Sequence, residues 1–270
     1  MTVERPFAEP PIVDAHAHIL TRRMPLRDDA WIRPDYDYTA EDFLADLDRH
    51  GIAFGIVTAA SLYGDYNDYT LAALGRYRRL RATVMLQPDT DLATLRHLRD
   101  QGVVGVRMQW KVDQAPPDLR SYPYLKFLNR LADCGMHVEL NASAVQLAVV
   151  LPALEAHGVN VVVDHFGLLR APEGMEGAGF QAMLRAVAAG RTWVKISAGF
   201  RLDPAIRQAC AARLLVEAGG ERLLWGSDAP FVGKEGAVTY ADALAHFHAL
   251  APDPAVRRQI SDAALRLCFF

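Results

Sequence analysis

The feature that most constrains the fold of this chain is a regular alternation of short apolar runs with longer segments of helical periodicity. The apolar runs are rich in Val and Ile, which is typical of parallel strands that are buried on both faces. We expect strands at 11–19, 54–61, 81–88, 103–109, 136–141, 160–166, 192–198 and 222–228. We expect helices at 39–51, 66–78, 91–102, 122–135, 144–158, 177–190, 204–220 and 239–250. Repeated strand–helix units in a chain of 270 residues predict an α/β protein of the (β/α)8 TIM-barrel type.

Residues that start and end helices support this division of the chain. Thr39 and Asp42 have the spacing of a capping pair. Glycines stand where predicted helices end, at Gly51, Gly102, Gly135, Gly158 and Gly190. No linker-like stretch interrupts the chain, and no loop of the GxGxxG type follows the first strand, which disfavours a doubly wound open sheet. We therefore expect a single barrel domain over residues 1–270.

Composition excludes several classes of function. A net charge of −3 gives no general attraction for nucleic acid or for a membrane surface. The chain has no apolar stretch of membrane-spanning length, and its polar, proline-rich first residues lack the apolar region of a signal peptide. The three cysteines are far apart and predict reduced thiols in a cytoplasmic protein. We expect a small-molecule partner, and a homo-oligomer is compatible with this sequence.

The long connections of the chain all follow predicted strands. They cover residues 20–38, 110–121, 167–178 and 229–238, whereas the turns from helix to strand are short. In a (β/α)8 barrel the loops that follow strands lie over the carboxyl-terminal face, where the active sites of this fold are found. The sequence therefore predicts a functional site on that face.

Polar residues interrupt the apolar pattern near the carboxyl ends of these strands. His16 and His18 are two positions apart, so both point to one face of the first strand. Asp164 and His165 are neighbours, so only one of them is expected to enter the barrel. The further polar residues near strand ends are Arg107, Glu139, Asn141, Lys195, Ser197 and Asp228. Each buried group left unpaired costs about 1–3 kcal/mol, so their coincidence indicates a catalytic site.

Each of these residues alone has a plainer interpretation. Two histidines in HxH spacing can simply be well packed, and Asp228 in "SDAP" has the context of a turn residue. His137 lies at the start of its strand, on the opposite, structural face of the barrel. We interpret the remaining histidines as helix or surface residues: His50, His97, His157, His246 and His248.

The ordered set of motifs resembles the amidohydrolase superfamily, and within it the amidohydrolase-related family of 2-pyrone-4,6-dicarboxylate lactonase-like enzymes. The resemblance covers nearly the whole chain. Its carriers are "DAHAH" (14–18), "TAASLYGDYN" (58–67), "GVRMQ" (105–109), "VDHFG" (163–167), "VKISAGFR" (194–201) and "LLWGSDAPF" (223–231). The resemblance implies a (β/α)8 hydrolase that acts at a carbonyl, with His16, His18, His165 and Asp228 at its centre.

The resemblance also implies how a substrate is held. Arg107 and Arg201 would bind carboxylates, whose geometry the guanidinium group matches. Residues expected along the same pocket are Ser61, Tyr63, Asn67 and Asn141. Where the dicarboxylate lactonase has a second arginine after its fourth strand, this chain has Gln109 and Lys111, which puts a pyrone dicarboxylate substrate in doubt.

The chemistry expected of such a site is the opening of a small, carboxylated lactone by water. Asp228 would act as general base, and we expect burial to raise its pKa toward neutrality. His16, His18, His165 and Asp228 would hold one divalent ion, Zn or Mn, and Glu139 is a weaker candidate ligand. Metal-independent hydrolysis stays open, because the lactonase of the resemblance works without metal. Two alternatives remain: a metal-dependent decarboxylase of the superfamily, and a barrel that binds a small molecule without catalysis.

Overall fold

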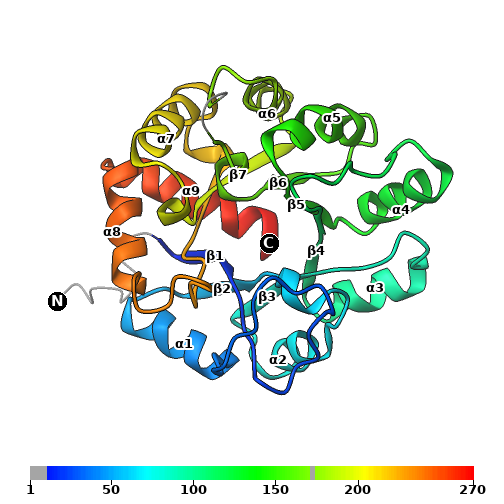
Figure 1. The fold of residues 1–270 in the computed structure, drawn as a ribbon, viewed down its shortest axis with the longest axis horizontal. Helices are drawn as coiled ribbons and strands as arrows, with labels where there is room; N and C mark the ends of the chain where they lie inside the picture. The colour runs from blue at the N-terminus through cyan, green and yellow to red at the C-terminus, as the bar shows by residue number, and fades with distance from the viewer. Residues whose placement is uncertain (1–10, 171–173) are drawn as a thin grey trace.

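The computed structural model describes residues 11–170 and 174–270, and these residues form a (β/α)8 barrel (Figure 1). Eight parallel strands follow one another around the sheet in chain order. The barrel closes between its last and first strands through a bridge of Ala17 with Ala229. The strands are β1 Val13–Ala17, β2 Phe54–Val57, β3 Leu80–Val84, β4 Val103–Gln109, β5 His137–Asn141, β6 Val161–Val163, β7 Thr192–Ser197 and β8 Leu223–Gly226. The predicted fold class is confirmed.

Helices surround the strands, as Figure 1 shows. They are α1 Ala40–Arg49, α2 Asp68–Arg76, α3 Leu92–Asp100, α4 Tyr122–Asp133, α5 Ala144–Glu155, α6 Ala178–Ala188, α7 Pro204–Ala218, α8 Tyr240–Leu250 and α9 Pro254–Cys268. Thr39 forms the predicted capping box with Asp42 at the start of α1. Parts of two predicted segments, the polar start of the chain at 1–10 and the loop at 171–173, lie outside the described residues.

The helix α9 is an addition to the eight predicted strand–helix units. Asp253 caps it, and Pro254 occupies its first turn, where proline needs no backbone donor. It packs across the amino-terminal end of the barrel (Figure 1). A small apolar cluster joins α9 to the strands: Val13, Ala15, Ile56, Val104, Val162 and Leu224 with Ala263, Ala264 and Cys268. This cluster fills the interior of the barrel at its amino-terminal end, so the polar side chains of the interior lie toward the opposite end.

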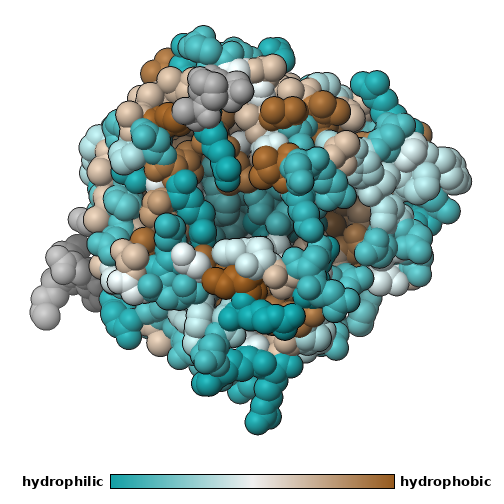
Figure 2. Space-filling model, viewed as in Figure 1, coloured by the Kyte–Doolittle hydropathy of each residue, from teal (hydrophilic) through white to brown (hydrophobic). Residues whose placement is uncertain are grey.

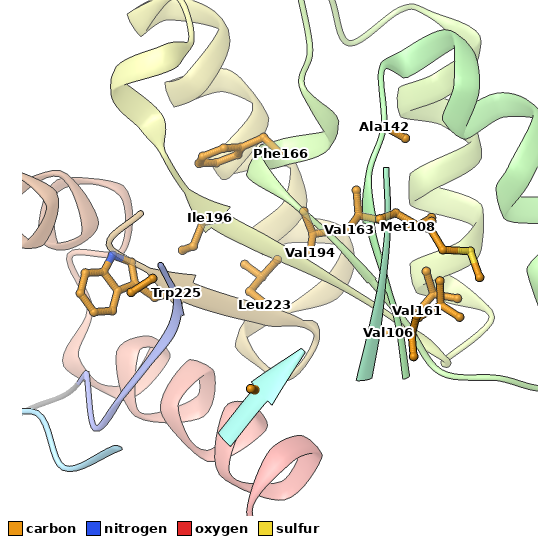
Figure 3. Packing of buried hydrophobic residues seen from close by; sticks show 14 of the residues in the cluster. Val106, Met108, Ala142, Val161, Val163, Phe166, Val194, Ile196, Leu223 and Trp225 are labelled. Atoms are coloured by element: carbon orange, nitrogen blue, oxygen red, sulfur yellow. The ribbon is translucent and has the colours of Figure 1, made fainter. Parts of the chain in front are cut away.

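The main hydrophobic core lies between the strands and the surrounding helices. Figure 3 shows Val161 and Val163 of β6 with Val194 and Ile196 of β7, which alternate along their strands. Alternation places the residues between them on the other face, so Lys195 of β7 is turned into the barrel. None of the helices in the described ranges is both long and apolar enough to cross a bilayer.

The contact between α5 and α6 depends on a glycine. A Cβ added to Gly179 would lie 2.0 Å from the carbonyl oxygen of Ala144, a backbone atom that cannot give way cheaply. We expect Gly179→Ala to lower the free energy of unfolding by about 1–3 kcal/mol, the usual cost of overpacking. Denaturant unfolding followed by circular dichroism measures the change.

Gly75, in the helix α2, is a matched control for this substitution. A Cβ there meets nothing within 4 Å. Gly75→Ala is expected to raise the free energy of unfolding by about 0.5–1 kcal/mol, through helix propensity alone. Equal effects of the two substitutions would contradict the proposed role of Gly179.

Candidate active site

A pocket opens at the carboxyl-terminal end of the barrel, where the predicted site residues meet. Its volume is about 190 Å³. Short 3-10 turns follow three of the strands there, at Ser61–Tyr63, His165–Gly167 and Gly199–Arg201. Figure 2 shows this face hollowed near its centre and bordered largely by hydrophilic side chains. The lining consists of His18, Trp31, Ala60, Ser61, Leu62, Arg107, Gln109, Asn141, His165, Leu168, Arg201, Asp228 and Val232.

Three imidazoles converge on one carboxylate oxygen at the base of the pocket. The Nε2 atoms of His16, His18 and His165 lie 3.6, 3.5 and 3.9 Å from Oδ1 of Asp228. The rings of His16 and His18 stand edge to face with centroids 5.0 Å apart, so the HxH motif places both on one side of β1. The predicted centre is thus brought together from β1, from the end of β6 and from the end of β8.

Hydrogen bonds on the far side of each ring orient the imidazoles. Nδ1 of His18 lies 2.8 Å from the carbonyl oxygen of Thr58, which accepts its proton and leaves Nε2 with a free lone pair. Nδ1 of His165 lies 2.8 Å from Oγ of Ser197. Nδ1 of His16 lies 3.2 Å from Oδ1 of Asp164 and 3.1 Å from Nζ of Lys195. All three Nε2 atoms are therefore directed toward Asp228.

The expectation that only one of Asp164 and His165 enters the barrel was wrong. The strand β6 ends at Val163, and the backbone turns into the left-handed region at His165, with φ of 50°. The alternation of strand side chains no longer applies beyond that point. Ligand atoms of His16, Asp164 and His165 consequently lie within 4.8 Å of one another.

A buried ionic network lies directly beneath the imidazoles. Nζ of Lys195 lies 2.6 Å from Oε2 of Glu139 and 3.3 Å from Oδ1 of Asp164. Arg107 lies 2.8 Å from Oδ2 of Asp164 and 3.1 Å from Oε1 of Glu139. Two cations and two carboxylates thus balance, which offsets the high cost of burying each charge alone. The sequence showed Lys195 and Glu139 as late-strand polar residues but gave no signal that they pair.

The pKa values of this network follow from burial and from the opposite charges. Burial favours the neutral lysine, but Asp164 and Glu139 outweigh it and raise the pKa of Lys195. Burial alone would raise the pKa of Asp164, but Lys195 and His16 hold it well below its usual range. Burial and the nearby charge of Asp164 raise the pKa of Glu139.

The prediction that burial raises the pKa of Asp228 toward neutrality was wrong. Burial acts in that direction, but the neighbouring side chains of His165, His18 and Arg201 together hold the pKa below its ordinary value. Nε of Arg201 lies 2.8 Å from Oδ2 of Asp228. Asp228 is therefore a carboxylate anion in the resting protein.

Two of the three imidazoles of the site, those of His16 and His165, are neutral near pH 7. Burial, and then the charge of Lys195, lower the pKa of His16 well below its usual value. Burial lowers the pKa of His165 to about 4, although Asp228 acts in the opposite direction. Neutral imidazoles are the form that binds metal ions or accepts a proton.

The donor set fits a mononuclear metal ion. Nε2 of His16 is buried and has no hydrogen-bond partner among the described residues, which fits the role of a metal ligand atom. His16, His18 and Asp228 form one group whose ligand atoms lie within 4.8 Å of one another. Glu139 belongs to neither of the candidate groups found in the described residues, since its oxygens face Lys195 and Arg107.

The predicted substrate-binding residues divide into two sets. Arg107, Arg201, Ser61, Gln109 and Asn141 line the pocket. Arg107 already bonds to Asp164 and to the carbonyl oxygen of Ala59, whereas the Arg201 side chain is 28% exposed. Arg201 is thus the more accessible cation of the two.

The other three predicted binding residues do not line this pocket. Tyr63 packs in an apolar cluster, and burial raises its pKa to about 12. The Asn67 side chain is used to tie its loop to the backbone of Met85. Lys111 lies in an outer basin of about 730 Å³, where its ammonium pairs with Asp29 at 3.0 Å.

Trp31 is a site residue that the sequence analysis missed. It lies in the long loop after β1, where no strand or helix period constrains its position. The residue is 61% exposed and lines both the inner pocket and the outer basin. An indole at the boundary of two cavities limits the size of a ligand that occupies the inner one. Its isolation in a polar loop, "DDAWIRP", was the one signal available.

Three imidazoles and a carboxylate at the carboxyl-terminal end of a (β/α)8 barrel define a class of barrel enzymes that activate water or polarise a carbonyl group. Comparison with known families agrees, because the family model described as amidohydrolase matches residues 13–267. The chain belongs to the amidohydrolase family.

Relatives within the family cover most of this chain. A 4-sulfomuconolactone hydrolase of Hydrogenophaga intermedia is 24% identical and covers 82% of this chain and 75% of its own. A probable 2-pyrone-4,6-dicarboxylic acid hydrolase of Acinetobacter baumannii, solved with citric acid bound, is 29% identical with a TM-score of 0.90, covering 96% of this chain and 99% of that one. A second structure named as a 2-pyrone-4,6-dicarboxylic acid hydrolase, from Pseudomonas putida, is 34% identical with a TM-score of 0.87. It covers 94% of this chain and 96% of its own.

Proposed function

We propose that this protein is a hydrolase that opens a small, carboxylated lactone. The observation that carries the proposal is the placement of the Asp228 carboxylate between three imidazoles and an accessible guanidinium at the base of a small pocket. The names of its relatives, which are hydrolases of sulfomuconolactone and of a pyrone dicarboxylate, support the same reaction class.

The pocket suits a compact anion. A volume of about 190 Å³ accommodates a single small ring with its substituents. Arg201 offers its guanidinium at the pocket wall, and the polar side chains of Gln109 and Asn141 lie across the same cavity. A guanidinium fork binds carboxylate oxygens with two parallel hydrogen bonds. We therefore propose a lactone with at least one carboxylate.

In the proposed reaction Asp228 accepts a proton from the attacking water, whose oxygen bonds to the ring carbonyl carbon. The tetrahedral intermediate then collapses, the bond from this carbon to the ring oxygen breaks, and the proton passes from Asp228 to the leaving oxygen. A substrate carboxylate bound to Arg201 draws positive charge away from Asp228, which makes Asp228 a stronger base in the complex. Without an ion, the Nε2–H of His165, which is present when Oγ of Ser197 donates to Nδ1, stabilises the developing oxyanion.

We also propose that His16, His18, His165 and Asp228 hold a single divalent ion, Zn or Mn. Such an ion supplies Lewis-acid polarisation of the carbonyl and lowers the pKa of bound water. The unpartnered, buried Nε2 of His16 and the fixed orientation of the other two rings support this assignment.

A panel of lactones with no, one or two carboxylates tests the function. Release of acid is followed at constant pH, and release of carbon dioxide from carboxylated aromatic acids is followed in parallel. We expect hydrolysis of carboxylated lactones, with kcat/KM lower by about 10²-fold for the uncharged ones, since an unmet charged hydrogen bond costs about 1.5–3 kcal/mol. Carbon dioxide release without lactone hydrolysis would instead establish a decarboxylase.

Elemental analysis of protein purified without chelator tests the metal separately. One equivalent of Zn or Mn is expected, and His16→Ala is expected to bind substantially less. Full hydrolytic activity in protein that holds little metal, unchanged by chelators, would remove the ion from the proposal and leave the lactonase assignment standing.

A further inference from the structure

A second cavity lies at the opposite, amino-terminal end of the barrel. Its volume is about 510 Å³, and it lies between the starts of several strands and the end of α9. Its lining contains four arginines from four separate parts of the chain, namely Arg81, Arg99, Arg222 and Arg266. The reaction proposed above does not use this cavity.

Two of these guanidinium groups are held in place by aromatic rings. Arg81 lies over the ring of Phe269 at 4.9 Å and donates hydrogen bonds to the carbonyl oxygens of Arg78 and Leu80. Arg222 lies over the ring of Trp193 at 4.5 Å. Groups fixed before a ligand arrives lose less entropy when they bind it.

The charge of the cavity is unbalanced. Among residues 11–170 and 174–270, no side-chain carboxylate pairs with any of its four arginines. Glu221 and the terminal residue Phe270 bring the carboxylates of the lining, so the four arginines leave positive charge in excess even when both are counted. Burial and then the charge of Arg99 lower the pKa of Arg81, which is the direction expected of crowded cations. An anion in the cavity would relieve this repulsion.

We propose that the cavity at the amino-terminal end of the barrel binds a small oxyanion with several negative charges, such as a condensed phosphate or a tricarboxylate. Guanidinium groups bind both through paired hydrogen bonds. Several arginines around a volume larger than one phosphate favour a ligand with more than one anionic group. Recognition is by charge and not by base stacking, because the rings of Phe269 and Trp193 already carry guanidinium groups.

Calorimetric titration at low ionic strength with pyrophosphate and, separately, citrate tests this site. We expect at least one of them to bind and to raise the melting temperature, and the two arms distinguish the phosphate from the carboxylate source. Arg266→Gln and Arg222→Gln should each weaken that binding by about tenfold, because a charged hydrogen bond contributes about 1.5 kcal/mol. Arg266 is exposed, so its replacement leaves the fold intact.

Two control variants separate this site from other cationic surfaces. Arg185→Gln, on the exposed face of α6, should leave affinity unchanged. Arg201→Gln removes the accessible cation of the catalytic pocket and should also leave this binding unchanged. Binding of neither anion, or binding that Arg201→Gln abolishes and Arg266→Gln does not affect, would overturn the proposal.

Discussion

Replacing Asp228 by asparagine is expected to lower kcat/KM for the best lactone substrate by about 10³-fold or more, since a positioned general base contributes about 10²- to 10⁴-fold. The amide has nearly the same size but accepts no proton from water. It also removes the negative charge that faces Arg201 and the three imidazoles. Steady-state kinetics with the preferred lactone measures the loss.

Asp29→Asn is the matched control for this substitution. Asp29 is a partly exposed carboxylate in the outer basin, where it pairs with Lys111 and Arg27. Its replacement should change kcat/KM by less than threefold. If Asp228→Asn kept activity within tenfold of the unaltered protein, the proposed role of Asp228 would be wrong. Binding of a lactone by both proteins without turnover would indicate a non-catalytic binder.

Removing Lys195 is expected to affect stability and catalysis together. Lys195→Met leaves Glu139 and Asp164 with Arg107 as their one remaining cation, so a buried negative charge is uncompensated. Breaking a buried ion pair in this way costs about 3–5 kcal/mol of unfolding free energy. Activity should fall by about 10- to 100-fold, the usual cost of losing a group that orients a functional histidine.

A double substitution separates the two effects. Lys195→Met with Glu139→Gln restores the charge balance, so most of the lost stability should return, while activity stays low because His16 still lacks its neighbour. Arg213→Met, which removes an exposed pair with Glu217, should cost about 1 kcal/mol or less and serves as the control. Recovery of full activity in the double variant would show that Lys195 acts through stability alone.

The sequence predicted the barrel and the central four residues because both depend on local patterns. Apolar runs are visible as strands, and a histidine or aspartate at a strand end is visible as an exception. The position of the Asp164 side chain was harder to predict, because the barrel interior receives both Asp164 and His165 only through a left-handed turn at His165. The strand period does not encode this turn.

Contacts between distant parts of the chain could not be predicted from these local sequence patterns. The lowered pKa of Asp228 depends on His165, His18 and Arg201, which reach it from three separate parts of the chain. Tyr63 was expected along the pocket, but its ring is used for packing under the loop. The arginine-lined cavity is assembled from four separate segments, none of which is unusual alone.

The closure of the barrel has a consequence for synthesis of the chain. The carbonyl oxygen of His16 accepts a hydrogen bond from the backbone N–H of Asp228. The carboxylate of Asp14 accepts one from the backbone N–H of Ser227, which lies 213 positions later in the chain. The seam between the first and last strands is thus also the floor of the pocket. A ribosome must pass Asp228, two residues beyond the end of β8, before His16 and His18 can acquire this carboxylate partner, so a chain truncated earlier carries no assembled site.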